Sequence, residues 1–158
     1  MFRELIRKNK RLSDEECIRI LKSEKRGILS VNGDDGYPYG TPMNHWYNEE
    51  DGKIYFHCGN IGHRLDSLKN NGKVSFCTYD EGYRNPGEWA LNIKSVIVFG
   101  KIEIVDELDR IIDITRKLSH KFTQDDDYID AEINQHAKRT LLLVLDPEHI
   151  CGKTVQES

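Results

Sequence analysis

The segment 57–64 (HCGNIGHR) places two histidines, a cysteine, an arginine and two glycines between a predicted strand and a predicted helix. A helix start attracts anions, because its free backbone N–H groups and the positive end of its dipole point outward. Gly62 permits close approach, Arg64 can bind a phosphate through paired hydrogen bonds, and His63 can add a donor. We therefore expect an anion-binding site. The alternative is that the glycines make only a tight turn, with His63 and Arg64 facing solvent.

The same segment, together with His45, raises the question of a metal site. Imidazole and thiolate are ligands for zinc, copper and iron. However, His57 and Cys58 are adjacent on a strand and so point to opposite faces, and no Asp or Glu completes a ligand set at helical or hairpin spacing. We expect no metal here, and the alternative for His57 is an ordinary half-buried strand residue.

Other catalytic patterns do not occur in the sequence. It has no Gly-x-Ser-x-Gly elbow, no catalytic-cysteine signature, no GxGxxG fingerprint and no GxxxxGK[ST] loop. These absences disfavour a hydrolase and give no support to a Rossmann or P-loop nucleotide site. The four cysteines form no CxxC pair, so we expect reduced thiols rather than a zinc knuckle or a redox dithiol.

Alternating strand patterns and a few helical patterns must position these residues. Ser13, followed three residues later by Glu16, predicts a capping box and a helix that Gly27 could end. Strands are predicted over 28–31, 39–47, 53–58, 74–79, 90–105 and 140–145, with the long one bent near Gly100. Helices are predicted over 63–71 and 106–122, with partial helix over 124–139 and an irregular tail from Pro147.

Length and composition fit one domain over 1–158, with a helical segment 1–27, a barrel with helices over 28–146 and a tail over 147–158. About six strands with short turns favour a closed or partly closed antiparallel barrel, which is a mainly β fold with peripheral helices. Because a small sheet cannot hide its edges, we expect a homodimer. The formal charge of −4 disfavours a nucleic-acid partner. No apolar run could cross a membrane and no leader is visible, so we expect a cytoplasmic protein.

Four motifs in order give the chain a family resemblance. They are the segments 37–45 (YPYGTPMNH), 54–58 (IYFHC) with 62–64 (GHR), 94–101 (KSVIVFGK) and 149–153 (HICGK). Together they resemble the pyridoxamine 5'-phosphate oxidase-like flavin proteins, and the nitroimidazole-resistance (Nim-type) branch above all. The similarity extends over nearly the whole chain.

The resemblance implies a Greek-key split β-barrel homodimer that holds FMN in the groove between its subunits. The phosphate would lie at the strand end and the helix start, the ring would lie along the segment 42–45, and the partner would contribute its own strand. Many relatives have Ser-Ala where this chain has Cys58 and Gly59, and often lysine where it has Arg64. The cofactor-binding residues implied are Pro42, Met43, Asn44, His45, His57, Cys58, Gly62, His63, Arg64, Ser95 and Val96, and the candidate catalytic residue is His57.

The function implied is that of an FMN-dependent oxidoreductase that reduces a small acceptor such as a nitroaromatic compound, with NAD(P)H as the donor. Here His57 would orient a substrate or relay a proton. One alternative is a non-catalytic barrel that binds flavin, haem or a deazaflavin. Another is a barrel that binds no cofactor and acts through protein contacts.

Overall fold

The computed structural model describes residues 1–157 of the chain. Its first half contains η1 (Lys8–Lys10), α1 (Asp14–Ser23), β1 (Arg26–Asn32), η2 (Asp34–Gly36), β2 (Pro38–Asn44), β3 (Trp46–Asn48), β4 (Lys53–Gly59) and α2 (His63–Asn70). Its second half contains β5 (Lys73–Tyr79), β6 (Leu91–Val105), α3 (Leu108–Ser119), α4 (Asp126–His136), η3 (Ala137–Arg139) and β7 (Thr140–Glu157). In this order helices repeatedly interrupt the strands, so the sheet joins segments that are distant in sequence.

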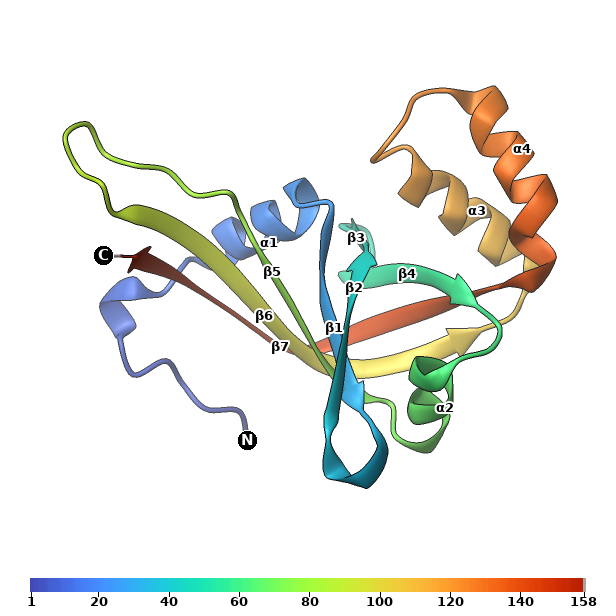
Figure 1. Cartoon of the computed structure of the whole chain (residues 1–158), viewed down its shortest axis with the longest axis horizontal. Coiled ribbons are helices and arrows are strands. Elements are labelled where there is room, and N and C mark those ends of the chain that lie inside the picture. The colour runs from blue at the N-terminus through green and yellow to red at the C-terminus, as the bar shows by residue number, and fades with distance from the viewer. Residues whose placement is uncertain (158) are drawn as a thin grey trace.

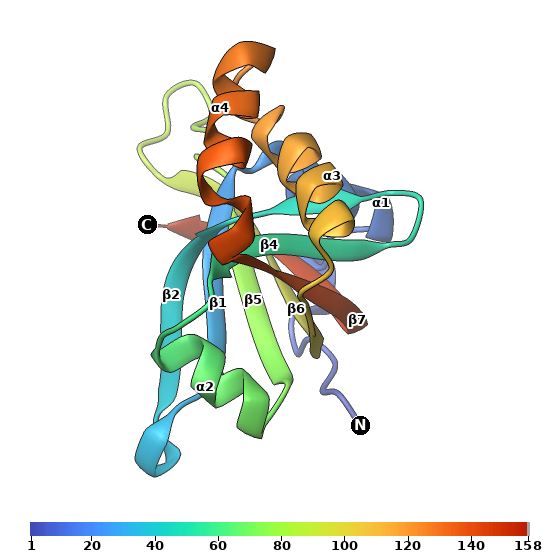
Figure 2. The same ribbon diagram turned by 90° about the vertical axis from the view of Figure 1, so that its right-hand side faces the viewer.

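The strands form one antiparallel sheet with the order β2-β1-β5-β6-β7-β4-β3. The sheet curls until β2 contacts β4, although no ladder joins these two strands within residues 1–157. Figure 2 shows β1, β2 and β5 running across the direction of β4. The fold is therefore mainly β, with peripheral helices and a curled sheet that is consistent with a split barrel.

The strand count and the C-terminal segment differ from the expectation. The described chain has seven strands rather than six, because the predicted strand 39–47 is divided into β2 and β3. The segment after Pro147 is not an irregular tail, since it continues β7 and pairs with β6 as far as Glu157. The long β6 explains this extension, because its first half would otherwise lack one hydrogen-bonding neighbour. The predicted bend of β6 is present as an irregularity in the ladder between Phe99 and Gly100.

His45 separates β2 from β3 because its side chain is needed in the core. The ring is fully buried, its Nε2 lies 2.8 Å from the carbonyl oxygen of Leu21, and it packs edge-on against Phe76. Its backbone N–H donates to the carbonyl oxygen of Lys25. These contacts tie the bend between the two strands to the end of α1.

The predicted capping box at the start of α1 is confirmed, but the helix ends before Gly27. The Ser13 side chain accepts from the Glu16 backbone N–H, and the Glu16 carboxylate accepts in return. The helix ends at Ser23, and Gly27 already belongs to β1. A Cβ at Gly27 would lie only 2.6 Å from the ring of Phe76, so glycine is needed here for close strand packing rather than for ending a helix.

Two apolar clusters lie on opposite sides of β4 and β7. The larger fills the barrel and includes Leu21, Phe56 and Phe76. The smaller joins the outer side of β4 and β7 to α3, through Ile111 and Ile114 among others. Figure 1 shows α3 and α4 together as a helical layer beside β4. Within residues 1–157, no helix is long and apolar enough to span a membrane.

Candidate functional site

Strand β4 separates the site residues into two groups, because alternate side chains point to opposite faces. Phe56 and Cys58 are buried in the barrel cluster, whereas Tyr55 belongs to the cluster beneath α3. His57 points to the same side as Tyr55 and is exposed to a cavity. The predicted site is therefore built on both faces of one strand.

On the barrel side, Arg64 bridges the opening between β2 and β4. Its Nη1 donates to Thr41 Oγ1 at 2.9 Å. The guanidinium also lies close enough to the Cys58 thiol to oppose the rise in its pKa that burial causes. The Nε atom of Arg64 is buried and has no hydrogen-bond partner in the described chain. A buried cationic donor without a partner is costly unless an anion or a water completes it.

Gly62 leaves the turn before Arg64 open, whereas His63 contacts the acidic side chain of Asp34. Gly62 has φ of +139°, which only glycine adopts readily, and no atom outside its immediate neighbours lies within 4 Å of where its Cβ would be. The His63 ring packs against Tyr39 with a centroid separation of 4.2 Å, and its Nε2 lies 3.4 Å from Asp34 Oδ2. The side chain of His63 is therefore directed toward the β1–β2 hairpin, and an anion at the helix start would have to draw it away from Asp34.

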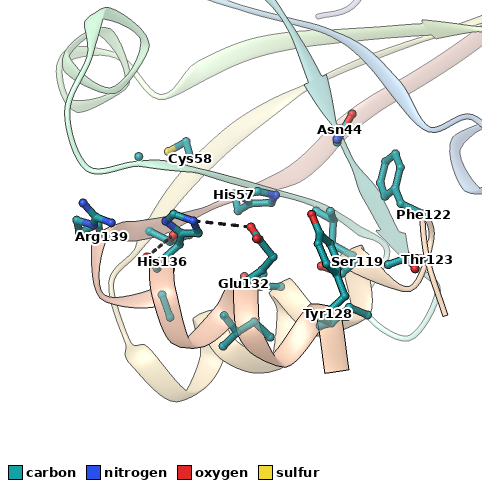
Figure 3. Close-up of a pocket in the computed structure, with 17 residues that line it drawn as sticks. Asn44, His57, Cys58, Ser119, Phe122, Thr123, Tyr128, Glu132, His136 and Arg139 are labelled. Carbon is teal, nitrogen blue, oxygen red and sulfur yellow. Dashed lines mark hydrogen bonds and ion pairs between the residues drawn. The ribbon is translucent and has the colours of Figure 1, made fainter. Parts of the chain in front are cut away.

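On the other side of β4, a cavity of about 580 Å³ lies between the sheet and the helical layer. Figure 3 shows residues from β4, α3 and α4 converging on it, with His57 facing the side chains of α4. The lining residues used below are Asn44, His57, Cys58, Thr115, Phe122, Tyr128, Glu132, His136 and Arg139. This size is within the range of small-molecule and cofactor sites.

His57 is the central polar residue of this cavity. The surrounding walls desolvate its ring and so lower its pKa from the usual 6.5. A neutral imidazole can both donate and accept a proton at pH 7. Opposite it, His136 Nε2 lies 3.7 Å from Glu132 Oε2 along α4. Thr115 also lines the cavity, and its hydroxyl oxygen is buried without a hydrogen-bond partner in the described chain.

The segment 42–45 contributes to the site at only some of its positions. Pro42 and Asn44 are exposed, and Asn44 lines the cavity. Met43 and His45 are buried in the barrel, where burial lowers the pKa of His45 to about 3. Any contact that these two residues make with a bound molecule must therefore come from their backbone.

Ser95 and Val96 lie away from the cavity within one protomer. Val96 is completely buried in the barrel core. Ser95 is half-buried on the outer face of β6, opposite Tyr79 and Lys153 in the neighbouring strands. A role for these residues in the site requires a second copy of the chain.

Sequence reasoning expected the segment 124–130 to shape access to the cleft but assigned no site residue to the helical layer, and it did not include Thr41. Tyr128, Glu132 and His136 come from a segment that was predicted only as partial helix. Their i, i+4 spacings could have indicated a shared helix face, but not what that face opposes. Arg139 was missed because its position depends on the register that sets Thr140 opposite Gly59. No group of three or more His, Cys, Asp or Glu side chains within residues 1–157 is arranged to hold a metal.

Comparison with solved structures finds the same fold at low sequence identity. A structure from Bacteroides thetaiotaomicron, described as a candidate 5-nitroimidazole antibiotic resistance protein, is 16% identical with a TM-score of 0.77, over 93% of this chain and 87% of that one. A conserved hypothetical protein from Mycobacterium tuberculosis is 20% identical with a TM-score of 0.78, over 95% and 90%. An FAD-binding protein from Mesorhizobium loti is 21% identical with a TM-score of 0.66, over 92% and 97%.

Family comparison agrees with this structural likeness. A search of curated proteins finds no match to the chain. A family model described as pyridoxamine 5'-phosphate oxidase matches residues 13–154, which is most of the chain and contains every site residue described above. The chain therefore belongs to the pyridoxamine 5'-phosphate oxidase family.

Proposed function

We propose that the protein is an oxidoreductase that binds a flavin-type cofactor, FMN in particular, and reduces a small acceptor. The observation that carries this proposal is Arg64, whose buried Nε has no partner and whose guanidinium lies at the start of α2. A phosphate monoester would complete this donor. Family membership and the printed description of the Mesorhizobium loti relative as FAD-binding support a flavin-type ligand.

The phosphate would be held on the barrel side of β4. Arg64 supplies the charge, Thr41 orients the guanidinium, and the open turn at Gly62 leaves backbone N–H groups of the helix start free to donate. Cys58 offers only a weak S–H donor, and His63 can join after leaving Asp34. Each charge-assisted hydrogen bond would contribute about 1.5–3 kcal/mol, so a few of them suffice to hold a phosphate.

The flat ring would lie along the edge of β2. This strand pairs only with β1 in the described chain, so its other edge has backbone groups available for hydrogen bonds. Pro42 and Asn44 are exposed on this strand, and Asn44 lines the same cavity as His57. A site with apolar faces and a few polar groups at the edge suits a flavin, which supplies the electron transfer when bound.

His57 would serve the reactant rather than the phosphate. Its lowered pKa keeps the ring neutral at pH 7, so it can orient a reactant by hydrogen bonding or relay a proton. The acceptor would occupy the rest of the cavity beneath α4. A nitroaromatic acceptor, with NAD(P)H as the donor, is consistent with the description of the Bacteroides thetaiotaomicron relative.

We further propose a homodimer in which a second copy completes the site. Ile97, Phe99 and Val155 are only partly covered on the outer face of β6 and β7, which leaves an apolar surface for a partner. Such a partner would bring its own Ser95 and Val96 toward the cofactor, which one protomer cannot do. Size-exclusion chromatography with light scattering would test the dimer directly.

The decisive experiment is to load the purified protein with FMN and measure both binding and turnover. We expect a bound flavin spectrum, a rise in the melting temperature with added FMN, and oxidation of NADPH when a nitroaromatic acceptor is added. Parallel titrations with FAD and a deazaflavin would identify the preferred cofactor. A flavin spectrum without turnover would instead indicate a binding protein, whereas colourless protein without stabilisation would indicate a barrel that acts through protein contacts.

A further inference from the structure

The cavity between β4 and the helical layer is elongated, because one face of α4 lines it over two turns of the helix. Tyr128, Glu132 and His136 lie four residues apart, and all three line the cavity. Side chains at this spacing share one face of a helix, and eight residues rise about 12 Å along its axis. Figure 3 shows the three side chains in a row, with Tyr128 and His136 on opposite sides of Glu132. A ligand that fills this cavity is therefore long.

The Tyr128 end of the cavity is aromatic, because the end of α3 lies beside the start of α4. His120 Nε2 lies 3.3 Å from Asp126 Oδ1, which places Phe122, two residues after His120, near Tyr128. Tyr128 is 58% exposed, so much of its ring is uncovered in the described chain. Two aromatic side chains at one end of a cavity favour an aromatic ring as their ligand, through stacked or edge-on contacts.

Asn44 joins this aromatic end to β2. The ammonium group of Lys121, which precedes Phe122 in the sequence, donates to the carbonyl oxygen of His45 at 2.9 Å. Asn44, the residue before His45, lines the cavity. Figure 3 shows Asn44 on the same side of His57 as Phe122. Under the proposed function the flavin ring lies along this part of β2, so the reducible part of a reactant belongs at the aromatic end.

The opposite end of the cavity is basic. Arg139 lies there, because β7 pairs with β4 in a register that sets the next residue, Thr140, opposite Gly59. Arg139 is exposed and forms no ion pair within residues 1–157. Glu132 also lines the cavity, but its Oε2 lies 3.7 Å from His136 Nε2 on the same helix. The charge that is free to meet a ligand at this end is therefore that of the arginine.

We propose that this cavity binds an elongated aromatic carboxylate, with its ring between Phe122 and Tyr128 and its carboxylate on Arg139. A guanidinium matches a carboxylate through two parallel hydrogen bonds. His57 lies between the two ends and faces the chain that joins them. That such a carboxylate is the acceptor reduced at the flavin rests on the proposed function, whereas its binding to the cavity does not.

Calorimetry on the cofactor-free full chain tests this binding with three probes that share one ring and one chain length. The probes are 5-phenylpentanoate, 5-phenylpentan-1-ol and 5-phenylpentylamine. We expect the carboxylate to bind about tenfold more tightly than the alcohol at low salt, and the amine to bind most weakly. Equal affinities for the three probes, tightest binding of the amine, or no measurable binding of the carboxylate would overturn the proposal.

Two variants at exposed side chains then assign the ends. Arg139→Gln should weaken the carboxylate about tenfold and leave the alcohol within twofold, because only the carboxylate contacts the guanidinium. Tyr128→Ser should weaken the carboxylate and the alcohol by the same factor, about fivefold, because both present the same ring. Lys138→Gln, next to Arg139 but not lining the cavity, is the matched control and should change nothing. An equal loss for both probes in Arg139→Gln would contradict the assignment.

The same preparations distinguish this inference from the proposed function. If FMN fails to bind but the carboxylate is preferred through Arg139, the proposed function is wrong and the cavity still binds aromatic carboxylates. If FMN binds and supports turnover but that preference is missing, this inference is wrong and the proposed function stands. When both hold, 5-(4-nitrophenyl)pentanoate should have a KM about tenfold below that of the corresponding alcohol, and Arg139→Gln should remove this difference without changing kcat.

Discussion

The two faces of β4 have different surroundings although their residues are neighbours in the sequence. On the barrel face, Cys58 and Arg64 lie among buried groups, where a charged donor needs an anionic partner. On the other face, His57 lies in an open cavity whose far wall belongs to α4. The barrel face is suited to tight binding of a fixed group, and the cavity face to exchange of reactants.

This difference shows how two adjacent residues at a strand end can face two different environments. Because side chains alternate, the step from His57 to Cys58 crosses from one environment to the other. Under the proposed function, a motif that is contiguous in sequence divides into a binding half and a reacting half. Each half should respond to its own substitutions and leave the other unchanged.

The largest expected effect is the loss of the charge at Arg64. Arg64→Gln should weaken FMN binding about 30- to 100-fold, because a charge-assisted hydrogen-bond pair to the phosphate is lost. Riboflavin, which has the same ring and no phosphate, should bind equally to both proteins. Calorimetric or fluorescence titration would measure this, with Lys69→Gln on the same helix as the control. An equal loss for riboflavin would show that the two faces are not independent.

Substitution of His57 should change turnover rather than FMN binding, and by a smaller factor than Arg64→Gln changes the Kd for FMN. His57→Gln should lower kcat with a nitroaromatic acceptor about tenfold, since the proton relay is lost, and should keep the Kd for FMN within twofold. In the unchanged protein kcat should fall as the pH drops below 6.5, because protonation of His57 removes its acceptor. This limb of the pH profile should disappear in the variant. Full turnover in the variant would exclude a catalytic role.

A third prediction concerns the attachment of the helical layer that forms the cavity face. Lys121 Nζ donates to the backbone carbonyls of Glu24 and His45, so it joins the end of α3 to α1 and to the β2–β3 bend. Lys121→Met should lower the free energy of unfolding by about 1 kcal/mol at pH 7, because both carbonyls lose a donor. FMN binding at Arg64 should change little. Denaturant unfolding of both proteins would measure the difference.

The contribution of Lys121 to the free energy of unfolding should depend on pH in a definite direction. Burial lowers the pKa of Lys121 from 10.5 to about 8, so between these values the unfolded chain binds the additional proton. Stability attributable to this group must then rise as the pH increases from about 8 to 10.5. The stability of the unchanged protein relative to Lys121→Met should increase across that interval. A flat difference would mean that Lys121 keeps an ordinary pKa.

The smallest expected effect is at Cys58. Cys58→Ser should strengthen FMN binding about two- to threefold, because a hydroxyl is a better donor than a thiol in the same place. The kcat should change little, since the side chain is buried in the barrel cluster although Cys58 also lines the cavity. A change in kcat comparable to that of His57→Gln would show that this side chain acts on the reactant.

Much of the fold could be predicted from local patterns. The capping box at Ser13, the helix following Gly62 and the bend of β6 near Gly100 each rest on residues close in sequence, and the structure has them. The break at His45 could not be predicted in this way, because it depends on a contact with Leu21 made only in the folded protein. The strand after Pro147 was missed for the same reason, since it exists only as a partner of β6.

The candidate site was predictable in its residue types but not in its arrangement. Alternation along the strand predicts that His57 and Cys58 diverge, but not that a helix from residues 126–136 would oppose His57. Likewise, the pairing of His63 with Asp34 joins positions that no local periodicity relates. The residues that oppose His57 depend on how the helical layer packs on the sheet, and helix propensity and residue spacing do not determine that packing.

The length of β7 has a consequence for how the protein is made. This strand lies between β4 and β6 in the middle of the sheet, and it is the last strand of the described chain to be synthesised. Until it emerges from the ribosome, β4 has only the three-residue β3 as a ladder partner, and β6 lacks one edge. Nascent chains should therefore expose unpaired strand edges, which favour aggregation. Their dependence on chaperones should end abruptly once β7 is released.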